Sequence, residues 1–182
     1  MNAMPNTTDS QDCNDKFYPW EVLNTKDIYI SEPWVKVSLQ QVQLPTGKIV
    51  DDYHRIEFPD YCIIFAQTMD KKVIFERHYR HGVGATTLTL PSGAIEANEN
   101  PLEGARRELL EETGYTSRDW VALGSFVGNG NYGCGYAHIF KVANAKKVTK
   151  PDSGDLEATE LVMLDQQEIR CALQSGEISV LG

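Results

Sequence analysis

Basic residues are scarce in this 182-residue chain, where 17 Lys and Arg stand against 26 Asp and Glu for a formal net charge of −9. A protein that wraps DNA or RNA needs a basic face, so the composition excludes nucleic acid as the expected partner. Long apolar runs are absent too, and none approaches the roughly 18–20 residues that a membrane span requires. No basic-then-apolar leader opens the sequence. We therefore expect a protein without a membrane partner.

Cysteines are few and scattered, and no two of them form a CxxC pair. A disulfide scaffold in a small secreted domain needs a denser set, so reduced thiols in the cytoplasm are the expectation. The four positions are Cys13, Cys62, Cys134 and Cys171.

The order of elements predicts an α+β protein with a mixed sheet flanked by helices. Residues 1–15 are polar and patternless, which predicts a disordered tail. Residues 16–57 form an expected N-terminal β extension whose hairpin, 34–57, turns at Pro45–Lys48. Residues 58–182 form the expected main domain. Its predicted strands are 61–68, 73–80, 87–90, 119–128, 134–143 and 159–164, with a final helix from Asp165.

The clearest helix has Asn100 as its N-cap, Pro101 at its first position and Gly114 at its C-terminal end. On it, Glu108, Glu111 and Glu112 are spaced i, i+3 and i+4, so they share one face. Acidic helix faces are usually only solvated. Carboxylates this close repel one another, however, and a hard cation such as Mg²⁺, which prefers oxygen ligands, would neutralise them.

The spacing around this helix decides between the two interpretations. Gly93 is followed after five residues by Glu99, and after seven more by Arg107, Glu108, Glu111, Glu112 and Gly114. This pattern resembles the box of the Nudix hydrolase superfamily at every fixed position. The HYRHG, TLTLPSGAIE, PWVKV and LPTGK segments are similar to the ADP-ribose/ADP-sugar pyrophosphatase branch. The resemblance implies a Nudix fold, in which helices sandwich a mixed sheet that carries a loop–helix–loop box.

The resemblance also implies a site for Mg²⁺ or Mn²⁺. Glu108 and Glu112 match the leading metal ligands, Glu111 a supporting and catalytic one, and the Ser92 carbonyl a backbone ligand. Glu99 and Arg107 match the residues that hold the box together by charge-assisted hydrogen bonds. A metal at this position would neutralise the diphosphate and activate the attacking water.

Three residues outside the box match substrate contacts of the branch. Arg80 is expected near the substrate phosphates, although a surface arginine on a strand would explain it equally in isolation. Trp34 aligns with an aromatic that stacks on adenine from across a homodimer, and Tyr53 is a candidate for the other wall. A Trp in an alternating strand is more often part of a core. His78, His81 and His138 lack metal-ligand spacing and are interpreted as structural or surface residues.

The sequence departs from the branch between Asn129 and His138, where many ADP-ribose hydrolases carry an acid and this chain has none. The later acids Asp155 and Glu157 fall where relatives place a loop with the catalytic base, and we expect one of them to serve. The predicted function is hydrolysis of a nucleoside-diphosphate derivative, favouring ADP-ribose or another ADP-sugar. The alternatives are a different nucleotide sugar, a dinucleotide, or a non-catalytic nucleotide-binding module.

Overall fold

A computed structural model describes residues 18–152, 154 and 158–180 of the chain. The chain divides into two compact units, residues 1–57 and residues 58–182, which are described separately. The tail predicted for residues 1–15 lies outside the described residues.

The N-terminal unit is a three-stranded antiparallel sheet of β1 (Glu21–Ser31), β2 (Val35–Gln43) and β3 (Ile49–Glu57). The predicted hairpin is confirmed as β2 and β3, and its turn closes where the Leu44 amide donates to the Lys48 carbonyl. Strand β1 was not predicted. Two register shifts, at Val22/Asn24 and Asp27/Tyr29, interrupt the alternation that makes a strand visible in a sequence.

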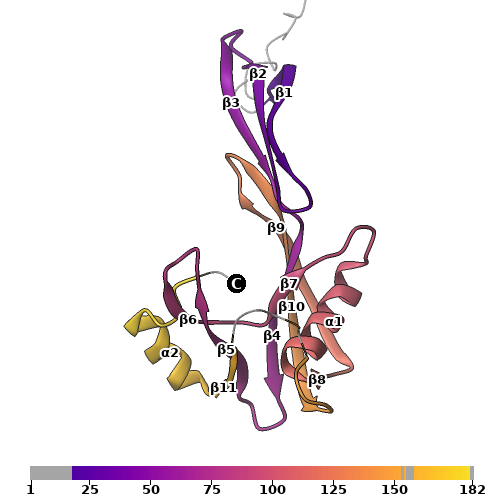
Figure 1. The fold of residues 1–182 in the computed structure, drawn as a ribbon, viewed down its shortest axis with the longest axis vertical. Coiled ribbons are helices and arrows are strands. Elements are labelled where there is room, and N and C mark those ends of the chain that lie inside the picture. The colour runs from indigo at the N-terminus through magenta and orange to yellow at the C-terminus, as the bar shows by residue number, and fades with distance from the viewer. Residues whose placement is uncertain (1–17, 153, 155–157, 181–182) are drawn as a thin grey trace, which may run out of the picture. The chain divides into compact units, whose positions relative to one another are not determined.

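The larger unit contains the remaining strands and both helices (Figure 1). Strands β10 and β4 run parallel and the other strand pairs are antiparallel, so the predicted mixed sheet is confirmed. The elements are β4 (Tyr61–Thr68), β5 (Val73–Arg80), β6 (Ala85–Thr89), β7 (Ser92–Ala94), α1 (Pro101–Thr113), β8 (Tyr115–Thr116), β9 (Asp119–Asn129), β10 (Gly133–Lys147), β11 (Glu160–Leu164) and α2 (Gln166–Ser175).

Strand β10 is longer than the predicted 134–143. Its pairing with β4 is interrupted between Val142 and Ala145, where Asn144 has a φ of 54°. This irregularity interrupts the alternation on which the prediction depends, so the predicted strand ended too early. Beyond it the strand continues to Lys147 and pairs with β8.

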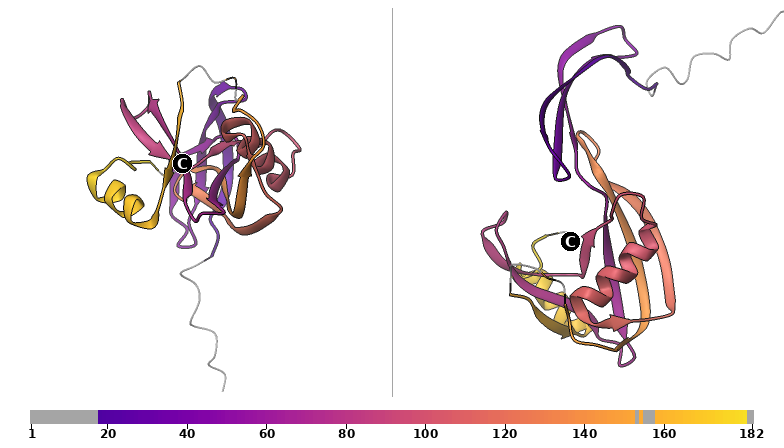
Figure 2. Two further views of the ribbon diagram at one scale, coloured as in Figure 1. Left: turned by 90° about the horizontal axis from the view of Figure 1, so that it is seen from below. Right: turned by 45° about the vertical axis from the view of Figure 1, so that its right-hand side comes forward.

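Two hydrophobic clusters hold the sheet between the helices, and Figure 2 shows α1 lying along the strands. The cluster under α1 contains Ala105 and Leu109 from the helix and Ile64, Ile74 and Phe140 from the strands. The second cluster joins Ala172 of α2 to β5, β6 and β11. Burying apolar side chains on both faces is the main source of stability expected for such a fold.

Strand β7 lies beside β4 and directly precedes the loop into α1. Strands β4 and β5 pair at Gln67 and Val73, close to their turn. Further along, β4 pairs with β7 through Ile63 and Ser92 and through Cys62 and Gly93. This arrangement brings Ser92 and Gly93 to the helix that carries the acidic face. Among the described residues, no helix is long and apolar enough to cross a membrane.

Candidate active site

Local sequence sets the position of α1. The Asn100 side chain accepts a hydrogen bond from the Leu102 amide at 3.0 Å, and Pro101 occupies the first turn. The helix ends at Gly114, whose φ of 71° favours glycine and whose amide bonds the Leu110 carbonyl. Ala105 and Leu109 are buried toward the sheet. The predicted start and end of this helix are confirmed.

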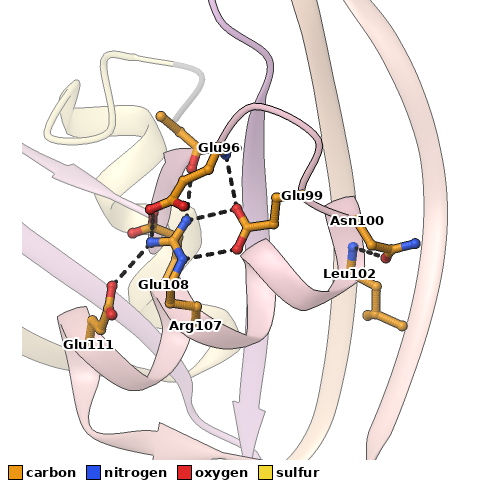
Figure 3. A network of polar contacts seen from close by, with 8 residues as sticks. Glu96, Glu99, Asn100, Leu102, Arg107, Glu108 and Glu111 are labelled. Carbon is orange, nitrogen blue, oxygen red and sulfur yellow. Dashed lines mark hydrogen bonds and ion pairs between the residues drawn. The ribbon is translucent and has the colours of Figure 1, made fainter.

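Arg107 joins the acids of the box into one network (Figure 3). Its Nε and Nη2 atoms donate to the two carboxylate oxygens of Glu99 at 3.1 and 3.0 Å. Its Nη1 donates to Glu108 at 2.7 Å and to Glu111 at 3.1 Å, and Nη2 also reaches the Ala94 carbonyl at 3.1 Å. One guanidinium therefore fixes three carboxylates and the loop that precedes the helix.

The pKa values of this network follow from the same contacts. The hydrogen bond from Arg107 holds the pKa of Glu99 below its usual value, and the bond from the Glu96 amide adds to the effect. The pKa of Arg107 is raised, chiefly by its bond to Glu99 and further by Glu108 and Glu111. Arg107 and Glu99 are therefore a charged pair at neutral pH.

Strand β7 contacts the acidic face of α1 through its backbone. The Ser92 amide donates to Glu112 Oε2 at 3.0 Å. A methyl group built on Gly93 would overlap the Glu108 carboxylate, so a larger residue here would displace that carboxylate from its present position. The structure thus places Glu108 and Glu112 against the Ser92–Gly93 backbone.

Cys62 lies beneath this contact and was not singled out by the sequence. It is fully buried and pairs with Gly93 across the strands. The pKa of its thiol is raised to about 11, mainly by burial and additionally by the negative charges of Glu108 and Glu112. The thiol is therefore protonated and unreactive at neutral pH. No local pattern marks this residue, because its role depends on strand pairing.

The donors present fit a hard divalent cation. No three His, Cys, Asp or Glu side chains in the described part of the chain converge as a metal cage by themselves. Mg²⁺ at phosphate sites usually takes one or two protein carboxylates and completes its shell with substrate phosphates and water. Glu108, Glu111, Glu112 and the Ser92 carbonyl offer oxygen only. The arrangement suits a cation that arrives with a phosphate-bearing substrate.

The substrate residues expected from the sequence lie in different units. Arg80 ends β5, and its carbonyl accepts the Val83 and Gly84 amides at the turn into β6. Trp34 and Tyr53 belong to the N-terminal unit. The Trp34 side chain is 70% exposed and is not a core residue, whereas Tyr53 contacts Trp20 edge-on with ring centroids 5.8 Å apart. Asp155 and Glu157 lie outside the described residues.

The backbone partners of the box were not predicted. The Ala94 carbonyl bonds Arg107, and the Asp152 amide donates to the Glu111 carbonyl at 2.8 Å. Backbone groups carry no side-chain signal in a sequence. The second contact ties the segment after β10 to the helix that bears the acids.

Comparison with known proteins agrees with this geometry. A family model described as NUDIX domain matches residues 59–177. The chain is 28% identical over 152 residues to an ADP-ribose pyrophosphatase of Bacillus subtilis (strain 168), covering 84% of this chain and 80% of the relative. It is 27% identical over 159 residues to the methanol dehydrogenase activator of Bacillus methanolicus, covering 87% and 84%. A solved structure described as an ADP compounds hydrolase shares the fold, with a TM-score of 0.76, 20% identity, and coverage of 88% and 85%.

Proposed function

The chain belongs to the Nudix family, and on that premise we propose that it hydrolyses the diphosphate linkage of ADP-ribose or another ADP-sugar. The products are a nucleoside monophosphate and a sugar phosphate, and the proposed cofactor is Mg²⁺ or Mn²⁺. One observation carries the proposal: Glu108 and Glu112 are held against the Ser92–Gly93 backbone. The similarity to the ADP-ribose pyrophosphatase of Bacillus subtilis supports the choice of substrate.

Some residues of the box would bind the cation, and others hold those side chains in position. Glu108, Glu112 and the Ser92 carbonyl would hold the cation, with Glu111 supporting. Arg107 orients Glu108 and Glu111, and Glu99 in turn fixes Arg107 with both oxygens. A divalent cation held there would supply charge neutralisation for the diphosphate and a lower pKa for the attacking water. Most of the rate gain then comes from positioning and electrostatics.

Arg80 is proposed to contact the substrate phosphates, where its planar guanidinium suits bidentate bonding. The base of the nucleotide is proposed to stack on Trp34, with Tyr53 as a second candidate wall. We further propose a homodimer, in which the N-terminal unit supplies Trp34 to the partner's site. The cytoplasmic location inferred from the cysteines stays a proposal, supported by the free thiols of Cys62, Cys134 and Cys171.

The exposed surface of the N-terminal unit supports the dimer. Among its described residues only Ser38 and Val42 are buried. Several large apolar side chains on it are half-exposed or more, and a partner surface would bury them. These side chains include Val22, Ile28, Tyr29, Ile30 and Trp34.

A substrate screen tests the proposed function. ADP-ribose, other nucleotide sugars and dinucleotides are incubated with Mg²⁺ or Mn²⁺, and a phosphatase then releases phosphate from the products for detection with malachite green. We expect the strongest signal with an ADP-sugar and none in EDTA. Turnover of dinucleotides alone, or only of nucleotide sugars with a base other than adenine, would show that the substrate is not an ADP-sugar. Nucleotide binding without turnover would favour the non-catalytic module, against which the intact acids argue.

A further inference from the structure

One face of β5 carries two buried polar side chains, Glu76 and His78, that the proposed mechanism does not use. Successive strand residues point to opposite faces, so Ile74, Glu76, His78 and Arg80 share one face. Ile74 belongs to the cluster packed under α1. Glu76 and His78 follow it and remain buried, with exposed fractions of 2% and 6%. This line of side chains therefore runs from the core beneath the catalytic helix toward Arg80.

Strand β6 meets this line with two buried threonines. Thr89 lies opposite Glu76 and Thr87 lies opposite His78 in the strand register. Both threonines are at most 2% exposed. The hydroxyl of Thr89 is 3.1 Å from His78 Nε2, which is a buried hydrogen bond between the two strands. Burying polar groups costs free energy unless they are bonded, so this pair specifies one relative position of β5 and β6.

The buried bond lies between two residues of the proposed site. His78 is two residues before Arg80 on the same face of β5. Thr89 is three residues before Ser92, and only Leu90 and Pro91 lie between them. The Pro91 carbonyl accepts a hydrogen bond from the Ile64 amide. Figure 1 shows β6 beside β5, with the chain passing from it to β7. A shift at Thr89 would therefore be transmitted to the backbone that contacts Glu112.

We propose that His78 and Thr89 are positioning residues, which fix the phosphate ligand Arg80 relative to the metal-binding Ser92–Gly93 segment. The inference rests on the proposed function for the roles of Arg80 and Ser92. Its physical basis is that a catalytic group displaced by about 1 Å can cost on the order of 100-fold in rate. Both side chains are buried, so the proposed role is to hold their neighbours in place.

The test compares three threonine variants. Thr89→Val keeps the shape and removes the hydroxyl, Thr89→Ser keeps the hydroxyl, and Thr86→Val changes an exposed threonine on the same strand. The readouts are kcat and KM for ADP-ribose at saturating Mg²⁺, and Mn²⁺ affinity without substrate from the resonance of free Mn²⁺. We expect Thr89→Val to lose about 10- to 100-fold in kcat/KM and to bind Mn²⁺ several-fold more weakly. Thr89→Ser and Thr86→Val should stay within about threefold of wild type.

Two results would overturn the inference. One is that Thr89→Val behaves like Thr86→Val in both readouts. The other is that Thr89→Ser loses as much as Thr89→Val, which would show that packing and not the hydroxyl matters. If Thr89→Val does not fold, His78→Leu and His78→Gln give the same comparison, because the Gln amide can still bond Thr89. If wild type hydrolyses no candidate substrate, the proposed function fails, while the Mn²⁺ affinities still decide the positioning role.

Discussion

Arg107 carries the electrostatic balance of the acidic face at the scale of single residues. It is the neighbour of Glu108 and the i−4 neighbour of Glu111, and it bonds both of these as well as Glu99. Like charges on one helix face destabilise a helix, and one guanidinium offsets part of that repulsion. The face stays net negative, because Glu108, Glu111 and Glu112 outnumber it. A divalent cation would complete the compensation.

The pair of Glu99 and Arg107 predicts a pH-dependent stability. The pKa of Glu99 is lowered from its usual 4.5, because Arg107 bonds the ionised form. The stabilisation is therefore fully present above that usual value and disappears as pH falls through the lowered pKa of the folded state. We expect Glu99→Gln to melt below wild type at neutral pH, and the difference to shrink in strongly acidic buffer. Thermal denaturation across acidic and neutral pH measures it.

The matched control is Glu103→Gln, since Glu103 forms an exposed pair with Arg106 on the same helix. Exposed pairs contribute little, so its melting temperature should stay near that of wild type. A Glu99→Gln difference that is as large at acidic as at neutral pH would remove the charge pair as its cause.

Local spacing predicted some contacts of the site and not others. That Glu108, Glu111 and Glu112 share a face follows from helical periodicity alone. The link from Arg107 to Glu99 followed from the family pattern, and the geometry shows it as two parallel bonds. The placement of Cys62 beneath Gly93 depends on pairing between β4 and β7, which no local pattern contains. The exposure of Trp34 was not predictable from the alternation either, because this residue lies in the turn between β1 and β2 and not in the expected strand.

At the scale of elements, the close approach of β7 to α1 predicts the effect of a single methyl group. Gly93→Ala would place that group on the Glu108 carboxylate and displace one or the other. We expect kcat/KM to fall at least about tenfold, a loss of about 1.4 kcal/mol in transition-state stabilisation. Steady-state kinetics at several Mg²⁺ concentrations measures it. Gly130→Ala is the control, because a methyl group there meets no atom within 4 Å. Equal activity of the two variants would contradict the close approach.

We expect the proton acceptor to lie in the segment after β10. The start of this segment is held to α1 and its C-cap, since the Val148 amide donates to the Gly114 carbonyl and the Asp152 amide donates to the Glu111 carbonyl. Glu157 is the first candidate base and Asp155 the second. If Glu157 accepts the proton, Glu157→Gln should lose roughly 10²–10⁴-fold in kcat with little change in KM. It should also lose the acid limb of the pH–rate profile.

Asp155→Asn is the matched comparison for that experiment, measured under saturating Mg²⁺. Loss in Asp155→Asn alone would move the role to Asp155. Wild-type kcat in both variants would show that the water is activated without a protein base.

At the scale of the whole molecule, the division of the chain into two units leads us to expect a dimer. The N-terminal sheet buries few of its own side chains, and we expect sedimentation to give a two-fold dimer. Trp34→Ala should chiefly raise KM, by about 5- to 150-fold, because stacking on a base contributes about 1–3 kcal/mol. Leu173→Ala, at an exposed position on α2, should leave KM unchanged. A stable monomer with full activity would rule the dimer out.

Both helices and most strands of the larger unit were predictable, because turns and alternation mark most boundaries, but the short strands β7 and β8 were not predicted. Which strands pair with one another was less predictable. The parallel contact of β10 with β4 joins segments more than 70 residues apart, from Ala137 to Tyr61. Periodicity predicts that a segment is a strand and which face is buried, but it does not name the neighbour. The family resemblance implied a mixed sheet, which the structure confirms, but it did not identify this pair of strands.

The central claim is that the acidic face of α1 catalyses metal-dependent hydrolysis of a diphosphate. Glu112→Gln keeps the shape and an acceptor for the Ser92 amide while removing a charge. Phosphorus NMR of ADP-ribose with Mg²⁺ should show the diphosphate signals replaced by two monophosphate signals with wild type, and turnover at least ~100-fold slower with the variant, about 3 kcal/mol. The variant should melt in EDTA at or above the wild-type temperature, since one like charge is gone. Near-normal turnover by Glu112→Gln would contradict the account.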